Sequence, residues 1–394
     1  MKRLIFFYLF FIFVDILFAD TMNENALKKL KESSPDSNII NFVILGDNRD
    51  TVLLPEGRFG NGDSILIKIV KSINRMIPAP EFVLNTGDVS LEGYRYEYNR
   101  YRSIIEASKV PWLTVRGNHE LYSDSGTYYF NKIVGDTDFV FDRGNLKIII
   151  LSNCHQLHLN RKNYSNYYIS KEQLIWLDSI LIDVNKSNKI PIVVSHVPPC
   201  IKGYYTRHCL GYSRQYPKPN IEKSNVKTFL RMLFFYRVPL AIFGHIHLYD
   251  SFDYNGVTFV ITGGAGAPLY TDFKRGVPVY HYILMRVFRT DSIKGIVLNP
   301  DGNEIDPGYN FTINLKGEVK PSSLRYKLSI RNNLLKFSFE SPLVRYITLN
   351  ESSGKVFYEG VFIKEDVGIP IIKGNNYRYV IKTGNRIQSG SFSY

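Results

Sequence analysis

Short apolar runs rich in β-branched residues alternate with segments of helical periodicity between residues 38 and 243. Strands are expected at 38–45, 81–85, 111–115, 146–152, 189–195 and 239–243, and helices at 63–77, 96–109, 170–183 and 222–236. Ser170 is the expected N-cap of the third helix. From residue 249 onward only strands and turns follow. This order predicts layered sheets with helices on the outside.

The second half of the chain contains a domain boundary. Residues 299–310, NPDGNEIDPGYN, are rich in turn formers, and no helical periodicity follows them. We therefore expect an N-terminal linker at 20–38, a main domain at 39–305, a linker at 306–320 and a small all-β module at 321–394.

The first 19 residues indicate a secretory signal peptide. Lys2 and Arg3 precede an apolar run that closes at Ala19, the expected cleavage position. Asp15 argues against a spanning helix, whereas Leu17 is larger than signal peptidases prefer, so retention as a membrane anchor stays open. No later segment is apolar for long enough to cross a bilayer. We expect a secreted, periplasmic or cell-surface protein.

The formal net charge of +13 is spread along the chain. The clearest basic cluster interleaves Arg95, Arg100 and Arg102 with tyrosines. A solvated helix face explains it better than a nucleic-acid surface, so we predict a general attraction for anions and no specific nucleic-acid partner.

The 3 cysteines are too few for a disulfide scaffold and odd in number. Cys200 and Cys209 would close a short loop in an oxidising compartment, with Cys154 left free or buried. Spacing alone does not decide whether this pair forms.

Potential metal ligands follow each of several predicted strands. They are Asp47 in LGDNRD, Asp88 in NTGDVSLEG, Asn118 and His119 in RGNHE, His196 in VVSHVPP, and His245 and His247 in FGHIH. Each motif alone has a structural explanation, because GD and GN are turn dipeptides. A chain with only 8 histidines does not readily place this whole set at strand ends for turns alone. The set predicts a metal site assembled from distant segments.

In this order the motifs resemble those of the calcineurin-like metallophosphoesterases, and TGGAGAPLY at 262–270 makes the chain similar to the purple-acid-phosphatase-like branch. The resemblance covers about residues 39–300 and implies a four-layer α/β/β/α sandwich, followed here by the C-terminal all-β module. It implies a phosphoesterase that acts on mono- or diesters by attack of a hydroxide bridging two metals.

The resemblance also implies a role for each motif residue. Asp88 would bridge two divalent or trivalent transition ions, Zn, Mn or Fe. Asn118, His196 and His245 would complete one site, and Asp47 and His247 the other. His119 would lie over the phosphate, where it either stabilises the transition state or protonates the leaving oxygen, and Asn118 would also contact the substrate.

Arg49 departs from the family pattern, which commonly has a histidine at that place. Purple acid phosphatases instead supply a tyrosine where this chain has Leu91. Tyr94 or a water would therefore complete the first metal site, that of Asp47, Asp88 and His247, or this site is weak. Arg49 either binds substrate phosphate through its guanidinium or forms a salt bridge to Asp50 or Glu92.

Other candidates have less support. NCHQLH, with Cys154, His155 and His158, lacks the second half of a metal site and is expected to be a loop. His208 and His281 have no evident context. The Tyr- and Arg-rich segment 200–220 is the expected substrate rim, and the alternative is an ordinary surface loop.

The alternative function is a surface binding protein of the same fold with an impaired first metal site. The oligomeric state is not predicted.

Overall fold

The computed structural model describes residues 20–36, 38–49, 61–159, 162–211, 224–289, 291–315, 326–340, 343–384 and 386–394. The predicted signal segment lies outside this range. None of the described helices is long and apolar enough to span a membrane.

Two six-stranded sheets form the main domain. The first sheet has the order β14 (Phe311–Asn314), β13 (Ser292–Leu298), β12 (Tyr282–Phe288), β1 (Ile39–Leu45), β2 (Val83–Asn85) and β3 (Trp112–Thr114). The second has the order β10 (Tyr249–Tyr254), β11 (Val257–Thr262), β9 (Leu240–Phe243), β8 (Ile190–Val194), β5 (Leu146–Ile150) and β4 (Phe139–Arg143).

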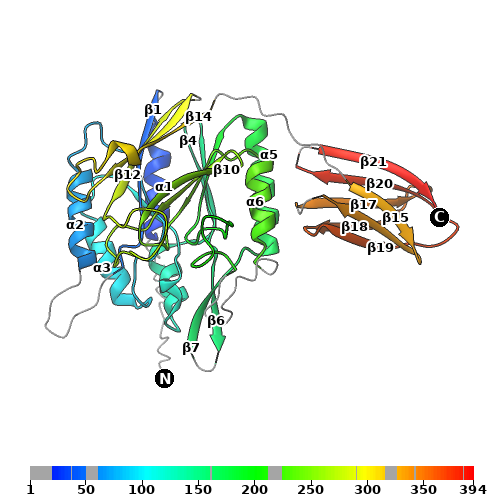
Figure 1. Ribbon diagram of the computed structural model, residues 1–394, viewed down its shortest axis with the longest axis horizontal. Helices are drawn as coiled ribbons and strands as arrows, with labels where there is room; N and C mark the ends of the chain where they lie inside the picture. Colours follow the sequence, from blue (N-terminus) through cyan, green and yellow to red (C-terminus); the bar gives the residue numbers. More distant parts are fainter. Residues whose placement is uncertain are drawn as a thin grey trace, which may run out of the picture.

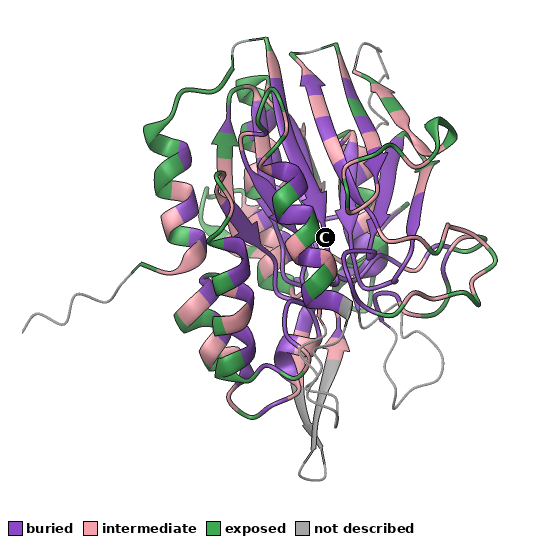
Figure 2. Cartoon of the chain, turned by 90° about the vertical axis from the view of Figure 1, so that its left-hand side faces the viewer, coloured by how far each residue is buried: buried purple, intermediate pink, exposed green. Residues whose placement is uncertain are grey.

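The helices cover the outer faces of these sheets, so the predicted α/β/β/α sandwich is confirmed (Figure 1). α2 (Asn61–Ile73) and α3 (Arg95–Ile105) share a buried core with the first sheet. α5 (Lys171–Ser187) and α6 (Val226–Phe235) share another with the second sheet. A third core fills the space between the sheets, where the strands are almost wholly buried (Figure 2). Its apolar residues from both sheets explain why these strands are continuous hydrophobic runs.

Parallel pairing places the ends of the central strands together. β1, β2 and β3 are parallel neighbours in the first sheet. In the second sheet β5, β8, β9 and β11 run parallel in that order. The carboxyl ends of parallel neighbours lie at one edge of a sheet, so the polar residues that follow these strands are brought close to one another.

The expected linker at 20–38 is wrong over α1 (Met22–Glu32). Thr21 and Glu24 form a capping box at its start. The Asn23 side chain donates to the Thr114 carbonyl at 3.0 Å and accepts from the Thr114 N–H at 2.9 Å, so α1 covers the edge of β3. Ala26 and Leu30 reach the core between the sheets. The segment has few apolar residues among its lysines, so its helical periodicity was too weak to predict α1.

Two further expectations about local structure are corrected. The linker placed at 306–320 contains β14, which pairs with β13 from Ser292↔Asn314 to Gly295↔Phe311. The expected loop at NCHQLH is a strand, β6 (Cys154–Leu159), paired with β7 (Lys162–Tyr167). In both cases a short strand gained its stability from a partner that the local sequence does not reveal.

The C-terminal region is all-β, as expected. One sheet contains β15 (Tyr326–Arg331), β16 (Leu334–Phe339) and β19 (Asp366–Pro370), and the other β18 (Val356–Phe362), β17 (Arg345–Glu351), β20 (Asn376–Thr383) and β21 (Arg386–Ser393). These sheets enclose their own core. Leu343 and Val344 also enter the core shared by α5, α6 and the second sheet, so the module packs beside these helices (Figure 1).

Candidate metal centre

Two groups of buried ligand atoms lie at the strand ends of the main domain. Asp88, His196 and His245 form one group, and Asp47, Asp88 and His247 form the other, with all the ligand atoms of each group within 4.8 Å of one another. Asp88 belongs to both groups. The loops that follow β1, β2, β8 and β9 therefore converge on two adjoining positions.

The first group has the geometry of a site for a cation. His196 Nε2 lies 3.2 Å from Asp88 Oδ1 and 3.1 Å from Asn118 Oδ1. His245 Nε2 is buried and has no hydrogen-bond partner. A buried imidazole nitrogen without a partner costs free energy unless something binds it, and a metal ion fits this donor set.

Backbone carbonyls fix the orientation of the histidines. His196 Nδ1 lies 2.9 Å from the Thr86 carbonyl oxygen, and His247 Nδ1 lies 2.7 Å from that of Pro268. A carbonyl can only accept, so each Nδ1 carries a proton. The Nε2 atom of His247 keeps its lone pair, whereas the Asp88 charge outweighs burial and raises the pKa of His196 to about 9, so His196 is protonated until a cation replaces its proton. His247 Nε2 is 3.5 Å from Asp47 Oδ1. This is the outer-shell support typical of metal-binding histidines.

The strand-end glycines are required by close packing. A Cβ atom at Gly117 would lie 2.3 Å from Asp88 Oδ1, and one at Gly244 would lie 2.5 Å from Asp47 Oδ2. The carboxylates thus occupy the space that a side chain would fill. This explains physically why the GN and GH motifs contain glycine.

Glu120 ties two of the loops together from beneath. Its buried carboxylate accepts the backbone N–H groups of Asp88, Val89, Ser90 and Gly117, at 3.1, 2.8, 3.0 and 2.6 Å. It also accepts the Ser90 hydroxyl at 3.0 Å. Burial and the charge of Asp88 raise the pKa of Glu120 to about 7, against these hydrogen bonds.

The protonation preferences of the site are those of a metal-binding centre. Burial raises the pKa of Asp47 to about 8, and the Asp88 charge adds to this effect. Burial holds the pKa of His245 well below its usual range and lowers that of His247 to about 3. His245 and His247 are therefore uncharged and able to bind a cation, and the two close carboxylates share the site with a positive charge, which the protonated His196 supplies when no metal is bound.

His119 is oriented differently from the other histidines. Its Nδ1 donates to the Leu91 carbonyl at 2.6 Å, and its Nε2 lies 3.9 Å from Asp88 Oδ2. Its ring contacts that of Tyr122 edge-on, with centroids 4.6 Å apart. Burial is the main cause that lowers the pKa of His119 to about 4. Because Nδ1–H is bound to Leu91, donation from Nε2 requires the imidazolium form.

Arg49 lies beside the shared carboxylate. Its Nε is 3.6 Å from Asp88 Oδ2 and is buried without a hydrogen-bond partner. A salt bridge to Asp50 or Glu92 is one of the two expected roles of Arg49; among the described residues its ion pair is with Asp88, and Asp50 lies outside them. Tyr94, the possible extra ligand, is 42% exposed and stacks on Tyr96.

The sequence interpretation missed His208. Its sequence neighbours indicate no function, yet its ring centroid lies 5.6 Å from that of His245 and 5.4 Å from that of Tyr270. A disulfide joins Cys200 and Cys209 and fixes the end of this loop. The signal available in the sequence was the position of His208 next to Cys209, which would pair with Cys200 in an oxidising compartment. His281 is buried and contacts Thr262 Oγ1 at 3.1 Å.

Comparison with known proteins identifies the family. The model of the calcineurin-like phosphoesterases matches residues 40–249, which include all the motif residues. The chain belongs to the calcineurin-like phosphoesterase family. The predicted resemblance is thereby confirmed.

Individual relatives of this phosphoesterase-family chain are distant. A probable glycerophosphodiester phosphodiesterase of Arcobacter nitrofigilis is 26% identical over 142 residues, covering 34% of this chain and 48% of the relative. A probable inactive purple acid phosphatase 24 of Arabidopsis thaliana is 23% identical over 245 residues, covering 52% of this chain and 37% of the relative. This chain thus spans less than half the length of these relatives.

Among solved structures, purple acid phosphatase PPD1 from yellow lupin (Lupinus luteus) seeds shares the fold. The TM-score is 0.54 at 18% identity, over 72% of this chain and 55% of that one. At this identity the likeness concerns the fold alone.

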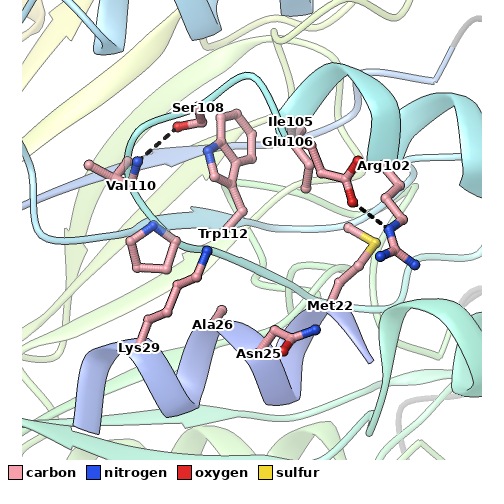
Figure 3. A pocket seen from close by; sticks show the side chains of 11 residues that line it. Met22, Asn25, Ala26, Lys29, Arg102, Ile105, Glu106, Ser108, Val110 and Trp112 are labelled. Atoms are coloured by element: carbon pink, nitrogen blue, oxygen red, sulfur yellow. Dashed lines mark hydrogen bonds and ion pairs between the residues drawn. The ribbon is translucent and has the colours of Figure 1, made fainter. Parts of the chain in front are cut away.

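A cavity of about 330 Å³ lies elsewhere, between α1 and the segment from α3 to β3 (Figure 3). Met22, Lys29, Arg102, Glu106 and Trp112 are among its lining residues. Figure 3 shows the Arg102–Glu106 ion pair at its side. No candidate site residue lines this cavity, so it is separate from the metal centre.

Proposed function

We propose that the protein is a secreted metal-dependent phosphoesterase that hydrolyses phosphate mono- or diesters. The observation that carries this proposal is the pair of buried ligand groups that share Asp88. A carboxylate between two positions offsets the repulsion of two cations about 3.5–4 Å apart. Mixed imidazole, carboxylate and amide donors suit Zn, Mn or Fe.

Each ligand has a proposed place. Asn118, His196 and His245 would hold one ion, Asp47 and His247 would hold the other, and Asp88 would be shared. Bound ions would supply Lewis-acid stabilisation of phosphoryl oxygens and would lower the pKa of water.

The residues of the chain position the ester and its proton. Arg49 places a buried guanidinium nitrogen at the shared carboxylate, where its remaining N–H groups bind phosphate oxygens. His119, held by Leu91, presents Nε2 toward the same carboxylate, and in its imidazolium form this nitrogen donates a hydrogen bond to the leaving oxygen. Asn118 supports the substrate beside His119.

Export of the protein is part of the proposal. The apolar N-terminal segment and the Cys200–Cys209 disulfide both fit an oxidising compartment outside the cytoplasm. Retention by an uncleaved segment is the alternative form of export.

The Asp88→Ala variant tests the function. It should abolish hydrolysis of 4-nitrophenyl phosphate and lower the content of both metals, because both groups lose a ligand. Asp63→Ala is the matched control, since Asp63 is equally buried but pairs with Arg100 at 2.9 Å on the outer helices. Full hydrolysis by Asp88→Ala, with Asp63→Ala behaving normally, would rule out the assigned chemistry.

A second candidate is a binding protein of the same fold whose first metal site, that of Asp47 and His247, is impaired. The position of Arg49 near Asp88 favours it, because a guanidinium competes with a cation for the same carboxylate. A relative is itself named as probably inactive. This candidate predicts phosphate binding without turnover by the metal-loaded protein, which single-turnover measurements would detect.

A further inference from the structure

Half-buried aromatic rings extend outward from the metal ligands. The Tyr270 ring stacks on His247, with centroids 4.3 Å apart and planes at 22°. Phe273 follows, stacked with Tyr270 at 5.9 Å and 21°. His208 contacts both rings and also His245. We call Tyr270, Phe273 and His208 the aromatic wall.

The wall is held in place by contacts on its outer side. The Arg207 guanidinium lies 4.3 Å from the centre of the Phe273 ring and donates to Asp272 Oδ2 at 2.7 Å. The Tyr270 N–H donates to the His247 carbonyl at 2.9 Å. The Cys200–Cys209 disulfide closes the loop that carries Arg207 and His208. Two separate chain segments thus support one surface, and little side-chain ordering remains to be done on binding.

The position of the wall determines what it contacts. Two of its rings touch the proposed ligands His245 and His247 directly, so a phosphoryl group at the metal centre lies next to the wall. The organic part of an ester is joined to that phosphoryl group through a single oxygen. Tyr270, Phe273 and His208 each keep part of their surface exposed, so the organic part meets aromatic carbon there.

We propose that the aromatic wall selects phosphate esters whose organic group carries a planar aromatic ring next to the ester oxygen, in preference to aliphatic esters. The inference rests on the phosphoesterase function proposed above. Offset-stacked and edge-on aromatic pairs are stabilised beyond the area that they bury, whereas an aliphatic group of equal size gains burial alone. The difference corresponds to about a two- to tenfold preference in affinity.

The test compares two phosphonates of equal carbon number, in which CH₂ replaces the ester oxygen. Benzylphosphonate is planar at its ring and cyclohexylmethylphosphonate is not. Calorimetric titration of the metal-loaded full chain should show that benzylphosphonate binds about two- to tenfold more tightly. Because this measures binding, it does not depend on turnover or on the leaving-group pKa.

Two variants locate the preference. Phe273→Leu and Tyr270→Leu should each reduce the ratio of the two affinities toward one, and Phe273 does so without contacting a proposed ligand. Phe288→Leu is the matched control, because Phe288 on β12 is also half-buried under a cation, with Lys294 Nζ 5.4 Å from its ring centre. It should keep the wild-type ratio.

The outcomes separate this inference from the proposed function. A wild-type ratio of one, or a ratio unchanged in both wall variants, overturns the aromatic preference. Selective binding of benzylphosphonate without hydrolysis of any ester supports the wall and contradicts the phosphoesterase function. Hydrolysis of esters with no discrimination between the phosphonates supports the phosphoesterase function and contradicts the aromatic preference.

Discussion

Replacement of Glu120 by glutamine tests how the site loops are held. The carboxylate uses both oxygens: Oε1 accepts from Val89 N, Ser90 N and Ser90 Oγ, and Oε2 accepts from Asp88 N and Gly117 N. A glutamine has one acceptor oxygen, so its NH₂ group must face one of these sets. In the better orientation the N–H groups of Asp88 and Gly117 lose their acceptor.

The cost follows from these two donors. Each buried unsatisfied N–H costs about 1–3 kcal/mol, so Glu120→Gln should lower the free energy of unfolding by about 2–6 kcal/mol. The loops that carry Asp88 and Asn118 also lose their common anchor, so metal content should fall. Urea denaturation at pH 7 and elemental analysis of the same preparation measure the two effects.

Glu97→Gln is the matched control. Glu97 is also buried, and its Oε2 accepts the backbone N–H groups of Glu92 and Tyr94 at 3.1 and 2.8 Å. An amide oxygen accepts both of these groups, so Glu97→Gln should lower the free energy of unfolding by less than Glu120→Gln does, with unchanged metal content. If Glu120→Gln behaved like this control, the carboxylate would not be the anchor of the site.

Four further variants have distinct expected outcomes. Burial raises the pKa of Asp178 from 3.8 to about 6, so the neutral form stabilises the fold below pH 3.8, and this contribution is lost as pH rises through 6. Asparagine cannot ionise, so the free energy of unfolding of Asp178→Asn minus that of the wild type should increase by about 2–3 kcal/mol between pH 4 and pH 7, as measured by urea denaturation. An equal difference at the two pH values would refute this. His119→Ala should reduce turnover by about 10² to 10⁴ with metal content intact, whereas loss of metal would make His119 a ligand. Arg49→Ala should weaken inhibition by phosphate without changing metal content, and unchanged inhibition would exclude the phosphate contact. Arg49→His should raise metal affinity if the site of Asp47 and His247 is weak, which dialysis against a chelator measures.

The strand ends were predictable because parallel pairing converts sequence order into spatial proximity. Asp47 and Asp88 follow neighbouring strands of one sheet, and His196 and His245 follow neighbouring strands of the other. Once alternation of strands and helices is recognised, their convergence follows. The sequence does not show the Glu120 network, because four of the five groups that donate to this carboxylate are backbone N–H groups, which any residue except proline supplies.

Other features depended on partners distant in the chain. α1 is stabilised by the hydrogen bonds of its Asn23 to Thr114 on β3, 91 residues away, and its own periodicity was too weak to predict it. The contact of Arg49 with Asp88 depends on the conformation of the turns that follow β1 and β2. Asp47 and Asp88 have positive φ angles in these turns, 61° and 55°. Backbone conformation of this kind redirects side chains in ways that strand and helix patterns do not encode.

The most direct test of the shared-carboxylate site is the metal stoichiometry of the full chain. Protein purified without chelator and titrated with Zn²⁺ or Mn²⁺ should bind two ions per chain by elemental analysis and calorimetry, and Asp88→Ala should lose affinity at both positions together. Binding of two ions by Asp88→Ala with wild-type affinity, or of none by the wild type, would contradict a dinuclear centre bridged by Asp88.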